Sequence, residues 1–364
     1  MRVCIFTLGC KTNYCDGEAM AARFAAAGHT VSLKPEPADL YIINTCSVTG
    51  YSDHKSRQAA AKARRLNSAA KIYVAGCGVQ SDAGQFDKYG IAGAVGTGGK
   101  VEFVDRIIAG DCLAIARNDE INLSLPDKFE EPAGIFKSRK RGFVKVQDGC
   151  DNYCTYCIVP YLRGKSRSRG PNSIVAEAAK KAEVCSEVVL TGINLSAYGK
   201  DLDPQITLVD LMCLLGSVGV KKRLGSLSPV IIDEQFLTAA AENNFVPEFH
   251  IPLQSGSDDI LKAMGRRYTA GEYIDKIALI RRSFPAAVIT TDVICGFPAE
   301  TDADHAATVR VLRQLQLNKV HVFPFSSRPG TKAASMDGKV DEKIIKQRAD
   351  ELSKNTLQTS GYMV

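Results

Sequence analysis

The 364-residue sequence predicts an α/β protein made of an N-terminal domain with a parallel sheet and a larger, barrel-like domain. Over about the first 115 residues, short apolar runs typical of strands alternate with Ala-rich stretches of helical length. After a polar segment that contains two prolines, the alternation resumes and produces six further strand candidates. Because strands joined by crossover helices are parallel, both parts should carry their sites at the carboxyl ends of the strands.

The first part is expected to have strands at residues 3–8, 40–44 and 71–75, and helices at residues 16–27 and 53–70. A cysteine closely follows each strand candidate. The three cysteines are Cys10, Cys46 and Cys77. Since the carboxyl ends of parallel strands meet at one edge of a sheet, these residues should converge there although they are distant in sequence.

Residues 118–136 are polar and lack periodicity, which is typical of a linker. The expected domains are therefore residues 1–117 and residues 137–364. Strands of the second domain are expected at residues 143–147, 187–190, 223–227, 248–253, 287–294 and 319–325. Helical stretches lie at residues 173–183, 208–215, 258–264, 270–282 and 302–315, with a final charged helix at 341–354. Six such units favour a barrel with its site at the C-terminal rim.

The composition, with 45% hydrophobic and 24% charged residues, is typical of a soluble globular protein. No apolar run approaches the ~18 residues that a membrane span needs, and the N-terminus does not have the pattern of a secretory signal. These observations predict a cytoplasmic protein, where disulfides are rare. Twelve cysteines in such a compartment indicate metal or redox work, or several buried thiols.

The strongest local signal is a C-x3-C-x2-C loop formed by Cys150, Cys154 and Cys157, directly after the first strand of the second domain. Three thiolates on one loop can hold three irons of a cubane cluster and leave the fourth open to a ligand. A zinc site that lacks its fourth ligand and a group of buried thiols are the alternatives. None of the five histidines lies near the loop in sequence, so the spacing favours an iron–sulfur cluster.

Charge is concentrated around this loop. The net charge of the chain is +6, yet residues 137–169 hold nine basic and two acidic residues, a net charge of +7 that leaves −1 for the rest. A generic charge run is most often a solvated surface. Because this run adjoins a reactive centre, it is predicted instead to bind RNA phosphates through Arg163, Lys165, Arg167 and Arg169.

The cysteine loop resembles the cluster loop of radical S-adenosylmethionine enzymes, in which an aromatic residue, here Tyr156, precedes the third cysteine. The longer string DGCDNYCTYCIVPYLRGKSRSR is similar to the methylthiotransferase branch. In that branch an N-terminal domain holds an auxiliary cluster on three cysteines, and Cys10, Cys46 and Cys77 match those motifs. The strings GCKTN, LTGINLSAYGKDL, HIPLQSGSDDILKAMGRRY, TDVICGFPAET and VHVFPFSSRPGT are most similar to the bacterial threonylcarbamoyladenosine tRNA methylthiotransferases.

The resemblance implies a partial (β/α)6 barrel radical-SAM domain with two 4Fe–4S clusters and S-adenosylmethionine as cofactors. Cys150, Cys154 and Cys157 would ligate the catalytic cluster, and the N-terminal triad would ligate the second cluster. The implied contacts to S-adenosylmethionine are Tyr156, Gly192, Asn194, Gln254 and Asp292. Family members usually end in a small β-barrel RNA-binding domain (TRAM), which is expected to be absent from this chain.

By the same resemblance, the activity would be methylthiolation of carbon 2 of N6-threonylcarbamoyladenosine next to the anticodon. The implied partners are the tRNA anticodon stem-loop and a reductant such as flavodoxin or ferredoxin, with the enzyme monomeric and not bound to a membrane. Isopentenyladenosine in tRNA, or an aspartate of a ribosomal protein, is an alternative substrate. A zinc-dependent RNA-binding protein without catalysis is an alternative of another class. Six cysteines are expected to have no role in ligation: Cys4, Cys15, Cys112, Cys185, Cys213 and Cys295.

Overall fold

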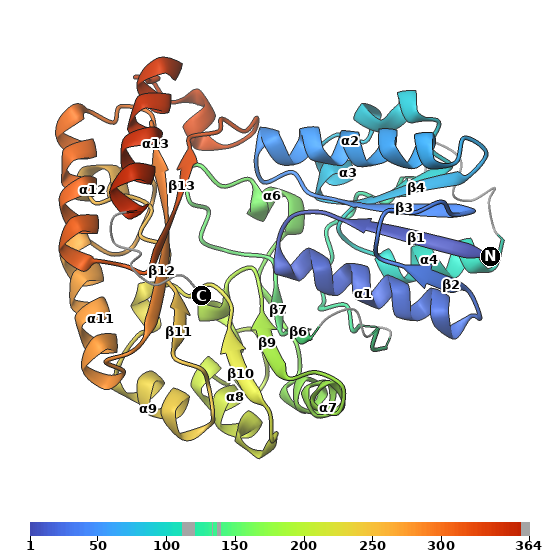
Figure 1. Ribbon diagram of the computed structural model, residues 1–364, viewed down its shortest axis with the longest axis horizontal. Coiled ribbons are helices and arrows are strands. Elements are labelled where there is room, and N and C mark those ends of the chain that lie inside the picture. The colour runs from blue at the N-terminus through green and yellow to red at the C-terminus, as the bar shows by residue number, and fades with distance from the viewer. Residues whose placement is uncertain (111–120, 133, 137–139, 358–364) are drawn as a thin grey trace. The chain divides into compact units, whose positions relative to one another are not determined.

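The structure, a computed structural model, describes residues 1–110, 121–132, 134–136 and 140–357 (Figure 1). The chain forms two compact units. One consists of Met1–Asp151 with Ile158–Ile193, and the other of Asn152–Cys157 with Asn194–Val364. The expected boundary 117/118 lies outside the described residues, and the boundary 136/137 lies where a described segment ends at residue 136, so both stay predictions.

The first unit contains a five-stranded parallel sheet in the order β2-β1-β3-β4-β5 (Figure 1). Its strands are β1 (Arg2–Thr7), β2 (Thr30–Ser32), β3 (Leu40–Thr45), β4 (Lys71–Gly76) and β5 (Gly93–Val95). Its helices are α1 (Lys11–Ala26), α2 (Gly50–Leu66), α3 (Cys77–Ser81) and α4 (Lys100–Ile108), and a 3-10 turn covers Gly84–Tyr89. This is the parallel sheet that the sequence predicts, extended by two three-residue strands too short for a periodicity signal.

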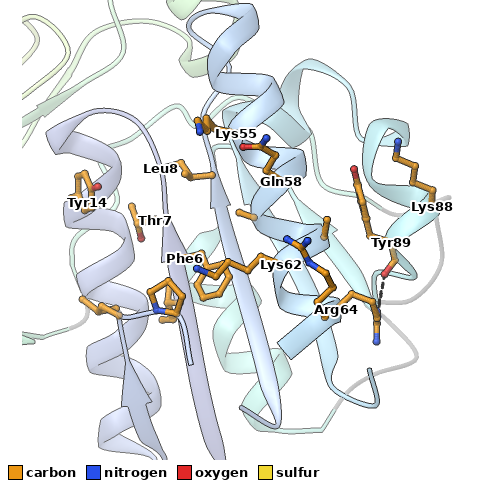
Figure 2. A pocket seen from close by; sticks show the side chains of 16 residues that line it. Phe6, Thr7, Leu8, Tyr14, Lys55, Gln58, Lys62, Arg64, Lys88 and Tyr89 are labelled. Atoms are coloured by element: carbon orange, nitrogen blue, oxygen red, sulfur yellow. Dashed lines mark hydrogen bonds between the residues drawn. The ribbon is translucent and has the colours of Figure 1, made fainter. Parts of the chain in front are cut away.

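One face of this sheet packs against α2, which buries Ala60 and Ala63 beside Phe6 and Ile43. The connection from β2 to β3 contains no helix, so it contributes none to the cover of this face beside β1. A cavity of about 930 Å³ lies there, between the end of β1 and the side of α2 (Figure 2).

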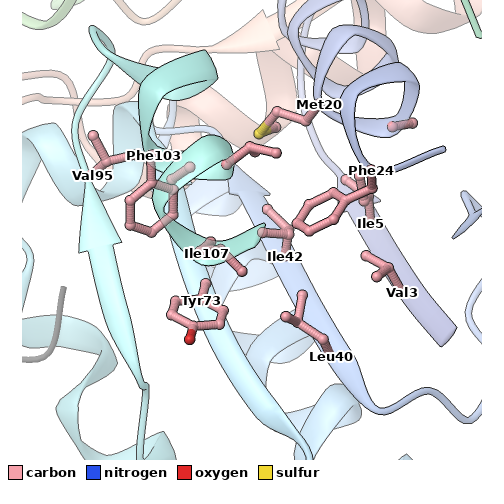
Figure 3. Packing of buried hydrophobic residues seen from close by; sticks show 13 residues of the cluster. Val3, Ile5, Met20, Phe24, Leu40, Ile42, Tyr73, Val95, Phe103 and Ile107 are labelled. Carbon is pink, nitrogen blue, oxygen red and sulfur yellow. The ribbon is translucent and has the colours of Figure 1, made fainter. Parts of the chain in front are cut away.

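The opposite face packs against α1 and α4 (Figure 3). Alternate residues of β1 serve the two faces, because successive strand side chains point in opposite directions. Val3 and Ile5 meet Met20 and Phe24 of α1, whereas Cys4 and Phe6 belong to the core on the α2 side. The short-period pattern of the sequence is therefore realised as a sheet that is buried on both faces.

The first unit continues with β6 (Arg141–Lys145), which pairs in parallel with β9 (Glu187–Thr191). Between them lie a short antiparallel pair, β7 (Gln147–Asp148) and β8 (Arg167–Ser168), and two helices, α6 (Val159–Arg163) and α7 (Pro171–Ala182). The proline at the first position of α7 suits a helix start, because that position needs no amide donor.

The second unit contains a parallel sheet in the order β11-β12-β13. The strands of this unit are β10 (Lys221–Leu224), β11 (Glu248–His250), β12 (Val288–Cys295) and β13 (Lys319–Pro324). Its helices are α8 (Leu208–Leu214), α9 (Glu234–Glu242), α10 (Asp258–Ala263), α11 (Ala270–Ser283), α12 (Asp302–Leu315) and α13 (Glu342–Leu357). Thr207, Thr269 and Thr301 form capping boxes that start α8, α11 and α12.

The predicted fold class is confirmed: the chain alternates strands and helices in both units, and its larger sheets are parallel. Two helices begin earlier than the sequence predicts. α1 starts directly after Cys10, and α2 starts at Gly50 because the Thr49 side chain accepts a hydrogen bond from the Ser52 amide (3.2 Å). Among the described residues, no helix is long and apolar enough to cross a membrane.

Candidate functional site

The N-terminal cysteine triad lies at the carboxyl ends of three adjacent strands. Cys10 follows β1 and occupies the N-cap of α1, Cys46 directly follows β3, and Cys77 directly follows β4 and begins α3. Because β1, β3 and β4 are neighbours in the sheet, the three cysteines come to one edge of it. The sequence predicts this position because each cysteine follows one of these strand segments.

The backbone before the triad is packed closely. Gly9 has a φ of +88°, and a Cβ at this position would lie 2.5 Å from the Cys46 Sγ, so only glycine brings this segment against Cys46. Ser56 of α2 holds Cys46 from the other side: its hydroxyl donates to the Cys46 carbonyl (3.0 Å) and accepts from the Cys46 amide (3.1 Å).

The thiols of the triad influence one another. Burial raises the pKa of Cys46 to about 11, and the nearby Cys77 and Cys10 thiols add to the rise. Within the described residues, no three Cys, His, Asp or Glu side chains are arranged so that they could hold a metal ion. The donor chemistry nevertheless fits an iron–sulfur cluster, since thiolates are its usual ligands and the Cys10 and Cys77 thiols lie close enough to the buried guanidinium of Arg163 to help raise its pKa.

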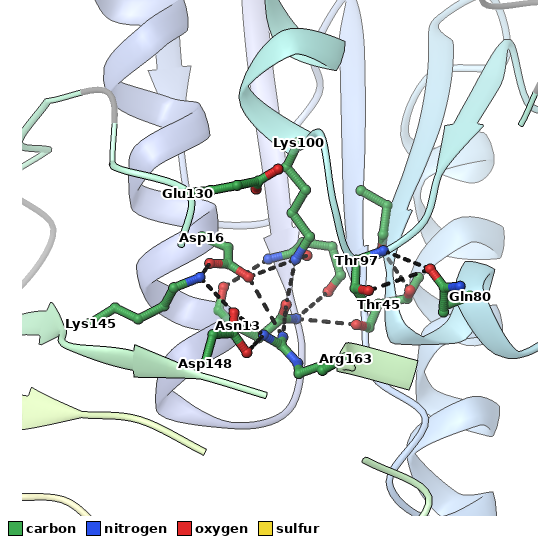
Figure 4. A network of polar contacts seen from close by, with 12 residues as sticks. Asn13, Asp16, Thr45, Gln80, Thr97, Lys100, Glu130, Lys145, Asp148 and Arg163 are labelled. Carbon is green, nitrogen blue, oxygen red and sulfur yellow. Dashed lines mark hydrogen bonds and ion pairs between the residues drawn. The ribbon is translucent and has the colours of Figure 1, made fainter. Parts of the chain in front are cut away.

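Arg163 belongs to a buried charge network in the first unit (Figure 4). Asp16 accepts from the ammonium groups of Lys100 and Lys145, each at 2.7 Å. Asp148 accepts from Lys145 at 2.8 Å and from Nη1 of Arg163 with both of its oxygens at 2.9 Å. Three cations thus share two carboxylates, and all five side chains are at most 10% exposed.

The electrostatics of this network favour the charged forms. Burial alone raises the pKa of a carboxyl group, but Lys100, Lys145 and Arg163 together lower the pKa of Asp16 to about 2. The pKa of Asp148 is likewise lowered, against the effect of its burial, by Arg163 and Lys145.

The network also fixes the segments that carry cysteines. The Asn13 amide donates to the carbonyls of Leu8 (2.7 Å) and Thr45 (3.2 Å), which precede Cys10 and Cys46. Lys100 in turn donates to the Asn13 side-chain oxygen (3.1 Å). The Gly149 amide donates to Asp148 (2.8 Å), directly before Cys150. One set of buried charges therefore orders the N-terminal triad and the start of the second cysteine loop.

The three arginines of the basic run are committed to such internal pairs, which differs from the exposed phosphate contact that the sequence predicts for them. Arg163 is 2% exposed and Arg167 donates to the carbonyls of Arg163 (2.9 Å) and Lys165 (2.7 Å). Arg169 is 4% exposed and pairs with Glu177 and with Glu131, the latter at 2.7 Å. These three guanidinium groups bind carboxylates and carbonyls of the protein, and of the four residues only Lys165 has an exposed side chain.

In the second cysteine loop, Cys150 belongs to the first unit, and Cys154 and Cys157 belong to the second. The Cys150 amide donates to the Gly164 carbonyl (3.0 Å). The Cys157 amide donates to the Cys154 carbonyl (2.9 Å), which closes a tight turn. Cys154 is buried, and its sulfur accepts a hydrogen bond from Nη1 of Arg266 (3.3 Å).

A cavity of about 130 Å³ lies beside Cys154. It is lined by Asn194, which was predicted to contact the cofactor, and by further polar side chains that carried no prediction: Asn152, Ser196, Lys200, Ser228, Arg266, Arg267 and Tyr268. Arg266 and Tyr268 form a unit, because the guanidinium lies 4.9 Å from the ring centroid and Nε donates to the phenolic oxygen (3.0 Å). The only signal for them in the sequence is the string GRRY after a helix.

The other predicted cofactor contacts are not among the residues that line this cavity. Tyr156 packs with Ile260, Met264 and Phe297, and this burial raises its pKa. Gly192 follows β9 in the first unit.

Gln254 and Asp292 are not among the residues that line the cavity. The backbone N–H of Gln254 donates to the Asp292 carbonyl (2.9 Å), and the Asp292 carboxylate lies 3.2 Å from Nε2 of His250. The His250 and His321 rings stand edge to face at 6.0 Å, which gives both histidines partners within the barrel strands.

The cysteines expected to have no role in ligation are mostly internal. Cys15 lies in α1 and packs against Phe143 and Val189, and burial raises its pKa. Cys4 and Cys295 are buried in β1 and β12, and burial raises their pKa values to about 11 and about 12. Cys185 is half-buried, Cys213 is exposed, and Cys112 lies outside the described residues.

Comparison with known proteins agrees with this geometry. Residues 144–312 match the radical SAM superfamily, and residues 2–93 match the uncharacterized protein family UPF0004. The chain is 35% identical over 363 residues to the threonylcarbamoyladenosine tRNA methylthiotransferase MtaB of Thermotoga maritima, covering 98% of this chain and 82% of that protein. It is 35% identical to the Bacillus subtilis MtaB (96% and 79% covered). It is 33% identical to the tRNA-2-methylthio-N(6)-dimethylallyladenosine synthase of Thermobifida fusca (95% and 72% covered).

Solved structures support the fold. The radical S-adenosylmethionine methyltransferase TsrM of Kitasatospora setae is similar with a TM-score of 0.66 at 14% identity, covering 92% of this chain and 77% of that one. Fold and cysteine loop define a radical SAM protein, which uses S-adenosylmethionine and a 4Fe–4S cluster. More narrowly, the chain belongs to the radical SAM methylthiotransferase family, and this confirms the family that its motifs indicate.

Proposed function

We propose that this protein is a tRNA methylthiotransferase that adds a methylthio group to carbon 2 of N6-threonylcarbamoyladenosine next to the anticodon. The observation that carries the proposal is the pair of cysteine triads, one at the carboxyl edge of a parallel sheet and one in the C-x3-C-x2-C loop. The substrate is suggested by the relatives named for threonylcarbamoyladenosine, which are 35–36% identical to this chain.

Cys150, Cys154 and Cys157 would hold the cluster that binds S-adenosylmethionine, and the N-terminal triad would hold a second 4Fe–4S cluster. When bound, these groups supply the radical that an unactivated aromatic C–H bond requires and the sulfur that is transferred. The site of the first reaction would include the cavity beside Cys154, where Asn194 and Lys200 present polar groups to a ligand.

The residues of the chain prepare these positions electrostatically. Arg266 donates to the Cys154 sulfur from a buried position, so a cation lies beside the atom that would ligate iron. In the first unit, Arg163 is the cation next to the N-terminal triad, because Cys10 and Cys77 are among the groups that stabilise its charge. Burial of Cys46, Cys77 and Cys154 limits the access of water and oxygen to the sulfur atoms.

The protein would act on tRNA in the cytoplasm. The bases of the anticodon loop would be splayed apart so that the adenine reaches the catalytic site. Flavodoxin or ferredoxin would be the reductant, and the enzyme would act as a monomer. Of the basic run, Lys165 remains the candidate for a phosphate contact because its side chain is exposed.

Deletion of the gene, followed by mass spectrometry of tRNA nucleosides, tests the proposal. Loss of 2-methylthio-N6-threonylcarbamoyladenosine, restored by the wild-type gene but not by a Cys154→Ala variant, is the expected result. If that nucleoside persists in a strain without a second copy of the gene, the assignment is wrong.

Methylthiolation of dimethylallyladenosine is the second candidate, because relatives named for it are 33–34% identical to this chain. The same spectra separate the two. Selective loss of the methylthio-dimethylallyl nucleoside would mean that dimethylallyladenosine, and not threonylcarbamoyladenosine, is the substrate.

A further inference from the structure

A cavity of about 930 Å³ in the first unit lies on the sheet face next to α2 and away from the charge network (Figure 2). Its floor is apolar and includes Leu8, Leu33 and Pro35. Five basic side chains also line it, and no Asp or Glu does: Lys55, Lys62, Arg64, Arg65 and Lys88.

Helix α2 concentrates this charge. Its 17 residues include five basic side chains and one acidic side chain, Asp53, for a net charge of +4. Lys55, Gln58, Lys62 and Arg65 are all exposed, and their spacing of three to four residues places them on one face of the helix. At 1.5 Å per residue, this stripe runs for about 15 Å, which suits a chain of phosphates better than a single anion.

The cations of the stripe are available to a partner. Among the described residues, Lys62 and Arg65 form no ion pair, and Lys55 lies over the ring of Tyr51 at 5.2 Å. Arg64 differs, because it donates to the carbonyls of Ser68, Ala70, Tyr89 and Gly90 and so anchors the adjoining turns.

The stripe begins beside the N-terminal triad. Ser56 lies one residue after Lys55 and binds the backbone of Cys46 through two hydrogen bonds. Tyr51, at the start of the same helix, is 69% exposed. Exposed aromatic rings between cations are typical of RNA-binding surfaces, because unstacked bases can lie on them.

From these observations we infer that the exposed face of α2, formed by Lys55, Lys62 and Arg65 with Tyr51 at its start, binds the phosphate backbone of the RNA substrate. The inference rests on the proposed function for the identity of the RNA. It assigns the RNA contact to the N-terminal sheet domain, whereas the basic run after the cysteine loop uses its arginines internally.

The test compares the wild-type protein with the K55Q/K62Q/R65Q variant, both full-length and reconstituted with iron and sulfide. Fluorescence anisotropy measures their affinity for a labelled tRNA anticodon stem-loop and for an unrelated RNA hairpin over a range of salt concentrations. Phosphate contacts do not depend on sequence, so the variant should bind both RNAs at least ~10-fold more weakly near 0.1 M salt. The slope of log K against log salt should fall by about 2–3.

The matched control is R282Q/K343Q/K346Q, which removes the same charge from exposed positions of α11 and α13. It should bind RNA with nearly the wild-type salt slope, and both variants should keep the wild-type iron content. If K55Q/K62Q/R65Q binds RNA like the control, the inference is wrong, whether or not the enzyme modifies tRNA.

The two proposals fail separately. If the triple variant binds RNA as tightly as the wild type, and the wild-type gene restores the methylthio nucleoside, the protein has its proposed function but does not bind RNA through this surface. Weaker RNA binding by the variant, in a protein that modifies no tRNA, supports the surface and rejects the function. If the triple variant binds RNA as the wild type does but its cluster is reduced more slowly by flavodoxin, the exposed face of α2 binds an acidic protein and not RNA.

Discussion

Removal of one carboxylate from the buried network should destabilise the first unit strongly. In the Asp148→Asn variant, Arg163 loses the two-oxygen acceptor that it contacts at 2.9 Å, and Lys145 loses a partner at 2.8 Å. Three buried cations would then share Asp16 alone. Breaking a buried pair costs about 3–5 kcal/mol because a charge is left without compensation, a large part of the ~5–15 kcal/mol that stabilises a typical domain.

Urea unfolding of the metal-free protein under reducing conditions, followed by far-UV circular dichroism, measures this loss. For an m-value of about 2–3 kcal/mol/M, the midpoint of the transition that includes the first unit should fall by about 1–2 M. The matched control is Asp105→Asn, since Asp105 pairs with Arg23 on the surface with both side chains at least 40% exposed. A midpoint for Asp148→Asn that equals that of the control would refute the reasoning.

Three further predictions concern the first unit. Asp16, with a folded pKa lowered to about 2, should contribute about 2 kcal/mol above pH 4. This stability should disappear as the pH falls through about 2, and the Asp16→Asn variant should lose that part of the pH dependence in denaturant titrations. Gly9→Ala should lower the iron content of reconstituted protein by about half, because its Cβ would collide with Cys46 Sγ at 2.5 Å. Cys15→Ala should keep the full iron content, whereas Cys10→Ala should lose about half of it.

Each of these predictions has a clear contrary result. An unchanged acid dependence in Asp16→Asn would mean that the carboxylate gains no stability from its cations. Full iron in Gly9→Ala would show that the backbone beside Cys46 can shift at little cost. If Cys15→Ala loses iron and Cys10→Ala retains it, the cluster ligand is Cys15 and not Cys10.

The sequence predicts the parts of the site that depend on local pattern and topology. Strand periodicity and the parallel connection rule are sufficient to place Cys10, Cys46 and Cys77 at neighbouring strand ends. The burial of Cys15 also agrees with its position in a helix.

Charge partners could not be predicted in this way. Asp16 meets Lys145 across 129 residues of sequence, and no local pattern indicates that pairing. A count of basic residues therefore suggested an exposed phosphate-binding run, whereas Arg163 and Arg169 are turned inward by carboxylates from other elements. The same limitation hid Arg266, whose contact with Cys154 joins segments 112 residues apart.

The central claim is that two cysteine triads hold two separate clusters, and iron and acid-labile sulfide analysis after anaerobic reconstitution tests it most directly. Two cubane clusters correspond to about eight irons per chain. Variants with Ala at Cys10, Cys46 and Cys77, or with Ala at Cys150, Cys154 and Cys157, should each retain about four, and a variant with both sets replaced should retain none. Stoichiometric zinc without visible absorption, or about eight irons in either single-triad variant, would contradict the account.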